Sequence, residues 1–158
     1  MVVVAIIAVI VSVAVLAIRP GELSKSGRAY TERVTAKLEE LRLRATTTRK
    51  WQRLEVGSTS VTHYQSTTEG MAVPVDWVEL GVLTAPGGVS IYAFEDRTHQ
   101  APADPVPNRG DGIPGVIDFA PDGAGTAATI FITGADDDYE GRVTVFRATG
   151  AARQFDDF

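Results

Sequence analysis

The chain has 158 residues, of which 44% are hydrophobic and 22% are charged, and its formal net charge at pH 7 is −5. It contains no cysteine, which excludes a disulfide framework, a thiolate metal site and a cysteine nucleophile. Beyond its N-terminal apolar and helical stretches, about one hundred residues remain, enough for one compact domain.

The chain begins with an apolar stretch, residues 2–18, in which Ser12 is the only polar residue. A helix satisfies its own backbone hydrogen bonds, so this stretch suits a bilayer or an equally apolar helix bundle. At about 1.5 Å per residue it spans roughly 25 Å, slightly less than the roughly 30 Å hydrocarbon core. The positions that we expect to pack in a membrane or filament helix are Val4, Ile7, Val11, Val15, Ile18 and Pro20.

No basic residue precedes this stretch, whereas a secretory signal peptide requires a positively charged n-region. We therefore expect the true start of the protein to lie upstream of Met1. The alternative is a signal peptide that is cleaved after the small-residue segment Val15-Leu16-Ala17.

An amphipathic helix is predicted to follow, kinked at Pro20-Gly21. Apolar or small residues recur every three or four positions and define one helical face. We expect the helix to fray over residues 45–48, where β-branched threonines lose rotamer freedom, and we expect ion pairs between Arg28 and Glu32 and between Glu40 and Arg44. The residues expected to pack this stalk on the head are Leu23, Tyr30, Val34, Leu38, Leu41 and Trp51.

Charge is divided unevenly along the chain. Residues 19–53 carry ten basic and four acidic residues, net +6, whereas residues 54–158 carry five basic and sixteen acidic residues, net −11. Opposite charges on stalk and head would attract neighbouring subunits along a filament, more weakly at high salt. The alternative is that both surfaces are simply solvated.

From Trp51 onward the hydrophobic period changes from helical to two. The alternation and the turn residues predict strands that form antiparallel sheets or a sandwich. Asp96 begins a stretch rich in proline and glycine that is predicted to be a long exposed loop, residues 96–112. The predicted strands span residues 51–56, 60–65, 75–80, 89–94, 115–119, 127–133 and 142–147.

Motifs for chemistry are absent from the sequence. His63 falls in a predicted strand and His99 in the proline-rich loop, without the spacing of a zinc site, and no serine lies in a nucleophile motif. The acidic run Asp136–Asp138 could gather oxygen ligands for calcium, but it lacks the spaced pattern of a calcium loop and is more simply a solvated hairpin tip. We therefore predict no catalytic residues, no metal and no cofactor.

The N-terminal stretch MVVVAIIAVIVSVAVLAIRP resembles the first helix of type IV pilins and type II secretion pseudopilins. In that family a basic leader is cleaved before a phenylalanine or methionine, and a glutamate follows within a few residues. Neither the leader nor the glutamate is present here. The resemblance implies an α+β, pilin-like fold, with a transmembrane and stalk helix over residues 1–50 and a β-rich head over residues 51–158.

The second half of the chain resembles the H-type minor pseudopilins. In that branch a proline-glycine turn precedes a middle strand, and an F-x-P-x-G turn precedes two final strands and a terminal glycine turn. The matching residues here are Pro86 and Gly87, then Phe119, Pro121 and Gly123, and finally Gly150.

The resemblance implies a structural subunit of the type II secretion pseudopilus, in the bacterial inner membrane with its head in the periplasm. The partners it implies are other pseudopilins or minor pilins through the N-terminal helix, the inner-membrane assembly platform and the lipid bilayer. The alternative is a type IV minor pilin that serves assembly, adhesion or DNA uptake. We expect no nucleic-acid partner, because DNA capture favours a basic patch and the head is acidic. A membrane-anchored hydrolase is the third hypothesis, and it lacks any catalytic motif.

Overall fold

The computed structural model describes residues 20–100, 103–134 and 139–157, with side chains from residue 25 onward. These residues form one long helix followed by eight strands. The elements are α2 (Pro20–Thr48), β1 (Lys50–Val56), β2 (Ser60–Glu69), β3 (Trp77–Thr84), β4 (Ser90–Glu95), β5 (Gly115–Phe119), β6 (Ala128–Thr133), β7 (Glu140–Val145) and β8 (Ala152–Phe155).

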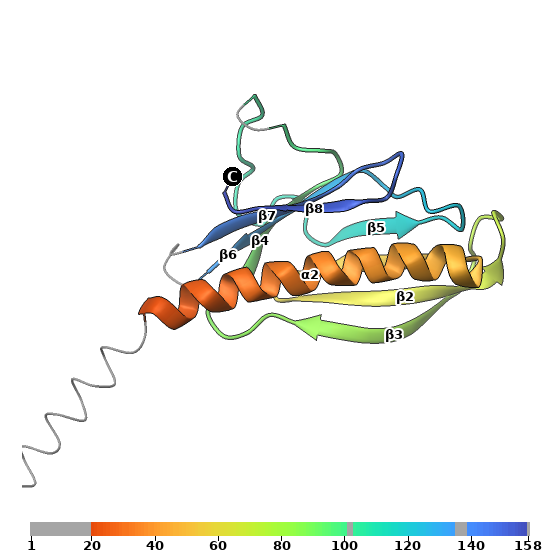
Figure 1. Ribbon diagram of the computed structural model, residues 1–158, viewed down its shortest axis with the longest axis horizontal. Helices are drawn as coiled ribbons and strands as arrows, with labels where there is room; N and C mark the ends of the chain where they lie inside the picture. Colours follow the sequence, from red (N-terminus) through yellow and green to blue (C-terminus); the bar gives the residue numbers. More distant parts are fainter. Residues whose placement is uncertain (1–19, 101–102, 135–138, 158) are drawn as a thin grey trace, which may run out of the picture.

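The strands form two antiparallel sheets. Sheet A has the order β3-β2-β1-β5, and sheet B has the order β4-β6-β7-β8. Helix α2 packs against both, chiefly against β1 of sheet A and against β7 and β8 of sheet B. Figure 1 shows α2 crossing the head with β2 and β3 on one side and β7 and β8 on the other. The predicted α+β fold, with a long helix packed on antiparallel sheets, is therefore confirmed.

The helical periodicity of α2 brings one face into the core. Tyr30, Val34, Leu38 and Leu41 are all at most 1% exposed, and burial of each such side chain contributes about 1.5–3 kcal/mol. Among the residues that the structure describes, no helix has the length and apolar character needed to span a membrane.

The C-terminal end of α2 does not fray as predicted. The helix continues to Thr48, and the hydroxyl groups of Thr46, Thr47 and Thr48 donate hydrogen bonds to backbone carbonyls three or four residues earlier. The three hydroxyl groups thus find their hydrogen-bond partners within the helix itself, as threonine side chains in helices commonly do. Arg49 then ends the helix with a left-handed backbone, φ 53°.

Each sheet contributes its inner face to a single core around α2. Sheet A brings residues from β1, β2 and β5, and sheet B brings residues from β4, β6 and β7. The principal contributors are Leu54, Val56, Val61, Ile91, Ile117, Phe119, Ile130, Ile132, Val143 and Val145.

Most predicted strands are present, and one was missed. Residues 115–119 match β5, and the hairpin of β1 and β2 forms as predicted. The strand predicted over residues 75–80 lies further along, at β3, and the one predicted over residues 142–147 begins earlier, at β7. Strand β8 was missed because its short sequence, ARQF, has little apolar alternation.

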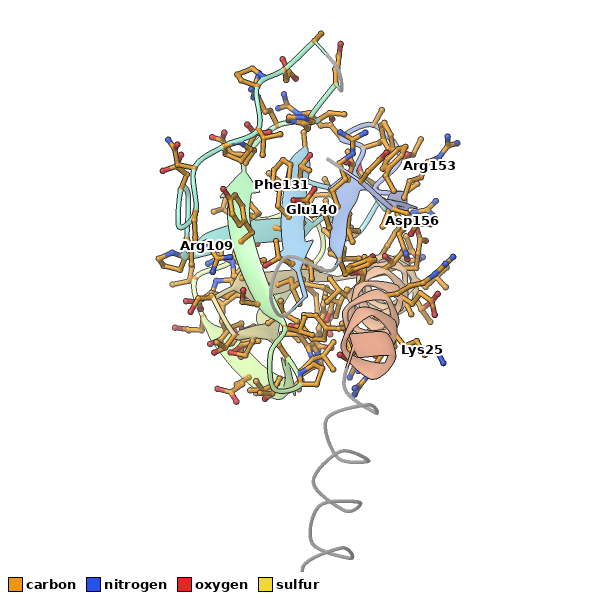
Figure 2. The ribbon with its side chains drawn as sticks, turned by 90° about the vertical axis from the view of Figure 1, so that its left-hand side faces the viewer. Lys25, Arg109, Phe131, Glu140, Arg153 and Asp156 are labelled. Atoms are coloured by element: carbon orange, nitrogen blue, oxygen red, sulfur yellow. The ribbon has the colours of Figure 1, made fainter. Side chains whose placement is uncertain are left out.

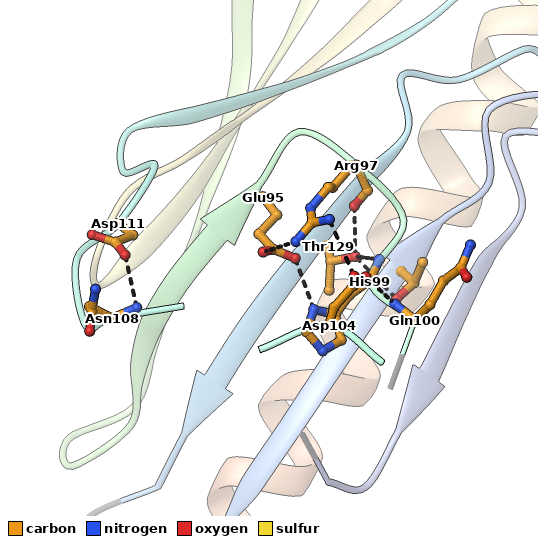
Figure 3. A network of polar contacts seen from close by, with 9 residues as sticks. Glu95, Arg97, His99, Gln100, Asp104, Asn108, Asp111 and Thr129 are labelled. Carbon is orange, nitrogen blue, oxygen red and sulfur yellow. Dashed lines mark hydrogen bonds and ion pairs between the residues drawn. The ribbon is translucent and has the colours of Figure 1, made fainter. Parts of the chain in front are cut away.

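The proline-rich loop forms as predicted, without helix or strand and mostly exposed over its described residues, but its first part is anchored to sheet B. It crosses the outer face of sheet B, where the amide of His99 donates a hydrogen bond to Thr129 Oγ1 (3.0 Å) and that hydroxyl donates to the carbonyl of Arg97 (2.9 Å). The His99 ring is edge-on to Phe131, with 5.1 Å between centroids. Figure 3 shows this network, in which Glu95 accepts from both Arg97 and the His99 ring. His99 is only 5% exposed as a result.

Candidate subunit-interaction surface

The face of α2 that points away from the sheets carries a stripe of three small or apolar residues in one line. Ala29, Ala36 and Leu43 are exposed and lie seven residues apart, and Leu43 is 62% exposed. A seven-residue repeat keeps them on one side of the helix, where a second helix can approach between the charged residues that separate them. Figure 2 looks along α2, which lies at the periphery of the head with Lys25 pointing outward. The stripe is therefore open to a neighbouring helix.

The opposite face of α2 joins the helix to the head. It holds the predicted packing residues Tyr30, Val34, Leu38 and Leu41. The hydroxyl of Tyr30 lies 3.5 Å from the carbonyl of Leu83, and burial raises the pKa of Tyr30 to about 12. This phenol thus stays neutral at every pH at which the head would function.

The remaining predicted helix positions cannot be placed in the head. Val4, Ile7, Val11, Val15 and Ile18 lie outside the described residues. Pro20 is the first residue of α2, and the side chains of Pro20 and Leu23 lie outside the described part. The acidic run at residues 136–138 is also outside it.

Trp51 lies on a different side of the molecule from the buried face of α2. It stands at an irregularity in the pairing of β1 with β2 and lines a surface hollow of about 440 Å³ with Ala120, Gly125 and Arg147. Its indole N–H is buried and has no hydrogen-bond partner among the described residues. The side chain thus packs against the turn after β5.

Tyr139 is a helix–head contact that the sequence did not indicate. A Cβ at Gly27 of α2 would lie 2.6 Å from the Tyr139 ring, and a Cβ at Gly141 would overlap its hydroxyl. Two glycines therefore make room for this ring between α2 and sheet B. The only sign of this contact in the sequence is the pair of glycines, whose lack of a side chain can accommodate a large aromatic ring.

The predicted turn motifs meet near the C-terminal end of α2. Gly123 and Gly150 both have left-handed backbones, φ 88° and 60°. A Cβ at Gly150 would lie 2.3 Å from the Gly123 carbonyl oxygen, and one at Gly123 would lie 3.1 Å from a Thr46 methyl group. Side chains are thus excluded where these two turns pack on each other and on α2.

The other motif residues are arranged separately. Phe119 is fully buried, and Pro121 is half-buried in the turn that follows it. In the other turn, the amide of Val89 donates to the carbonyl of Pro86 (3.0 Å), with Gly87 exposed between them. These residues shape hairpins and present no reactive group.

Ion pairs confirm one prediction and correct another. Arg28 and Glu32 form the predicted pair (3.4 Å). Glu40 pairs with Lys37 (2.6 Å) instead of with Arg44, because Arg44 donates to Gln65 of β2 (3.3 Å). Glu39 was not singled out, yet it accepts a hydrogen bond from the amide of Ala152 (2.6 Å) and so holds β8 to α2.

The described residues contain no group of three or more side chains suited to a metal ion. His63 faces α2 from β2, and burial, followed by the charge of Lys37, lowers its pKa. His63 lies in β2 of sheet A and His99 lies in the loop after β4, so the two rings are not part of one site. The features that suit recognition are therefore surfaces.

A long helix with one face buried against two antiparallel sheets and the other face open is the architecture of pilin-like proteins. The fold of the chain matches solved structures of this class. No family model matches the sequence, and a search of curated proteins finds no similar sequence.

Three solved structures illustrate the match. The minor pseudopilin EpsH of the type II secretion system of Vibrio cholerae is 15% identical, with a TM-score of 0.60, over 85% of this chain and 96% of that one. GspH of Escherichia coli is 15% identical, with a TM-score of 0.58, over 84% and 89%. The type IV minor pilin FimU of Pseudomonas aeruginosa is 11% identical, with a TM-score of 0.51, over 83% and 89%. The resemblance to the fold of H-type minor pseudopilins is thus confirmed.

Proposed function

We propose that this protein is a minor pseudopilin, a structural and non-enzymatic subunit of a type II secretion pseudopilus. The observation that carries the proposal is the division of α2 into a face buried in the head and an open stripe at Ala29, Ala36 and Leu43. A helix of this kind can hold its own head and pack on a second helix at the same time. A helix with these two contact faces suits a filament in which the helices lie inside and the heads lie outside.

The proposed assembly places the apolar stretch of residues 2–18 in the inner membrane and then at the filament centre. The head would lie in the periplasm and protein export across the outer membrane would be supported by growth of the filament. The partners would be other pseudopilins, reached through the helix, together with the inner-membrane assembly platform and the lipid bilayer. Fold similarity to EpsH and GspH supports this assignment.

A type IV minor pilin is the second candidate, and the fold match to FimU favours keeping it. DNA capture by such a subunit is disfavoured, because residues 54–158 carry a net charge of −11 and phosphate contacts require basic side chains. Deletion of the gene distinguishes the two systems. Loss of secreted enzymes from the medium with surface pili intact would support the pseudopilus, and loss of pili with secretion intact would support the pilin.

Cross-linking tests the helix seam directly, because the chain has no native cysteine to interfere. We expect Ala29→Cys, in cells that assemble the filament, to form cross-links to cysteines placed on the exposed helix face of other pilin-like subunits. Val106→Cys is the matched control, since Val106 is exposed on the loop that covers the far face of sheet B. Equal cross-linking at both positions, or none at Ala29→Cys in assembled filaments, would refute the proposal.

A further inference from the structure

Exposed apolar side chains are concentrated on one edge of the head. Of the ten large hydrophobic residues exposed in the described part of the chain, six lie between residues 71 and 82, at β3 and the segment before it. We call these the β3 edge patch: Met71, Val73, Val75, Val78, Leu80 and Val82. Val82, in the strand itself, is 54% exposed.

The patch coincides with an unpaired strand edge. β3 is the terminal strand of sheet A and pairs only with β2 among the described residues. Natural edge strands are usually blunted by lysine, proline or a covering element, whereas the charged residue within β3 is Glu79 alone. A long apolar edge of this kind is a template for another strand.

A groove of about 430 Å³ runs beside this edge, between β3 and α2. Leu54 and Val61 lie on its floor with His63, which is 7% exposed and whose Nε2 is buried without a hydrogen-bond partner. Gly81 pairs with His63 in the neighbouring strand, so no β3 side chain stands between His63 and the edge. The groove therefore opens from the edge patch toward an unsatisfied polar atom.

The groove favours a negatively charged group. Of its charged residues, Lys37 is neutralised by Glu40 at 2.6 Å. Arg33 remains, and it forms no ion pair within the described part of the chain. A carboxylate entering here would meet the Arg33 guanidinium and, at the groove floor, the His63 ring.

We propose that the β3 edge and this groove accept an extended strand from a neighbouring pilin-like subunit, with apolar residues at alternate positions and one glutamate pointing into the groove. Strands lie about 4.8 Å apart, so a residue opposite Gly81 would be about 10 Å from the β2 strand that carries His63. A glutamate side chain spans about half of that distance, and the rest lies across the groove that Arg33 and His63 line. The identity of the neighbour rests on the function proposed above.

Charge disfavours a second copy of this chain as the occupant. Symmetric pairing of β3 with itself would bring Glu79 of each copy to the same interface and would leave Arg33 without a counter-charge. A different subunit can supply the missing carboxylate. Self-pairing is therefore an outcome that the experiment must distinguish.

The test uses a seven-residue peptide of alternating valine and threonine with a central glutamate in place of one threonine, and a matched peptide with lysine there. Each carries a fluorescent label on a glycine-serine tail, and binding to the full chain in detergent micelles is followed by anisotropy. We expect the glutamate peptide to bind about tenfold more tightly than the lysine peptide. Arg33→Glu should reverse that preference.

Edge-blocking variants complete the test. Val82→Lys should abolish binding of both peptides, because a lysine blunts an edge strand. Val106→Lys replaces another exposed valine, 45% exposed against 54% for Val82, and should bind normally. Equal affinity of the two peptides, or binding retained in Val82→Lys, would overturn the proposal. So would self-association of the wild-type chain that Val82→Lys prevents. Ala29 does not line the groove. If Ala29→Cys still cross-links to other subunits but the chain binds neither peptide, this inference is refuted and the proposed function stands.

Discussion

The two sheets of the head are covered differently. Sheet A buries only the face that meets α2, and its terminal strand, β3, has no fully buried position. In the middle of sheet B both faces are covered: β6 has all six positions buried and β7 has five of six. The difference has two sources: β3 is an edge strand whereas β6 lies between two strands, and the loop after β4 contacts the outer face of β6.

Sheet A leaves its outer face available, and part of that face is held together by a polar contact. Arg53 of β1 forms two short hydrogen bonds to Asp118 of β5 and stacks over Trp77 of β3. On sheet B, the corresponding outer face holds Phe131 and Thr129 beneath the proline-rich loop. Sheet A is therefore the side that can take part in recognition, and sheet B is the side that stabilises the head.

The largest effect that tests this contrast is expected on the outer face of sheet B. Phe131 is fully buried against His99, so Phe131→Ala should lower the free energy of unfolding by about 3–5 kcal/mol through the cavity that it leaves. Thermal unfolding of the full chain in mild detergent, followed by circular dichroism, measures the loss. Amides of the loop near His99 should also exchange faster.

The matched control is Val116→Ala on the outer face of sheet A, where the side chain is 39% exposed. We expect it to change the free energy of unfolding by less than about 0.5 kcal/mol. Comparable losses in the two variants would show that the loop does not bury sheet B as described.

Sequence patterns placed strands in both sheets, but they did not predict what covers the outer face of each sheet. A strand with one covered face alternates visibly, and β1 and β5 were placed almost to the residue. In β6 the sequence ATIFIT is apolar on both faces, which is a sign of two-sided burial. What covers the second face could not be predicted, because the bond from His99 to Thr129 joins residues thirty positions apart.

The interaction surface shows the same limit. Helical spacing identified the buried face of α2, since it depends only on local periodicity. The α2–β3 groove depends on how far the helix lies from the edge strand, and Tyr139 finds its place through glycines in two separate elements. Neither the groove nor the position of Tyr139 can be predicted without the packed structure.

The next largest effect concerns the polar bridge across sheet A. Arg53→Ala should lower the free energy of unfolding by about 1–2 kcal/mol, since the Arg53–Asp118 contact is bidentate, at 2.7 and 2.8 Å, and two-thirds or more buried. Arg53→Lys should recover only part of this, because lysine keeps the charge but not the fork geometry. A double-mutant cycle with Asp118→Asn measures the coupling.

Arg28 and Glu32 supply the comparison, because both side chains are about 60% exposed. Their coupling in the same experiment should be close to zero, as is usual for surface pairs. If the exposed pair couples as strongly as Arg53 with Asp118, the bidentate geometry of the Arg53–Asp118 contact adds nothing to the stability of sheet A.

A smaller and opposite effect is expected at the junction between α2 and sheet A. Arg49 adopts φ 53°, a conformation that glycine tolerates and that costs other residues about 1–2 kcal/mol. After allowing for the greater freedom of glycine in the unfolded chain, Arg49→Gly should raise stability by about 0.5–1 kcal/mol. Thr48→Gly, one residue earlier and still helical, should instead lower stability by about 0.3–0.5 kcal/mol. Destabilisation by both variants would contradict the strain at Arg49.

The smallest expected effect is a pH dependence of stability that arises from His63 of sheet A. Burial and the nearby Lys37 lower the pKa of His63 below its ordinary 6.5, so the unfolded chain binds a proton more readily than the folded one. The contribution of His63 to the free energy of unfolding is therefore fully present above about pH 6.5 and is lost as the pH falls below that value. Melting temperatures measured between about pH 7.5 and about pH 5 should show this loss, and His63→Gln should remove it. Lys37→Gln should weaken it, because Lys37 repels the protonated ring and its loss frees Glu40 to attract it. An unchanged pH profile in His63→Gln would assign the dependence to groups elsewhere in the head.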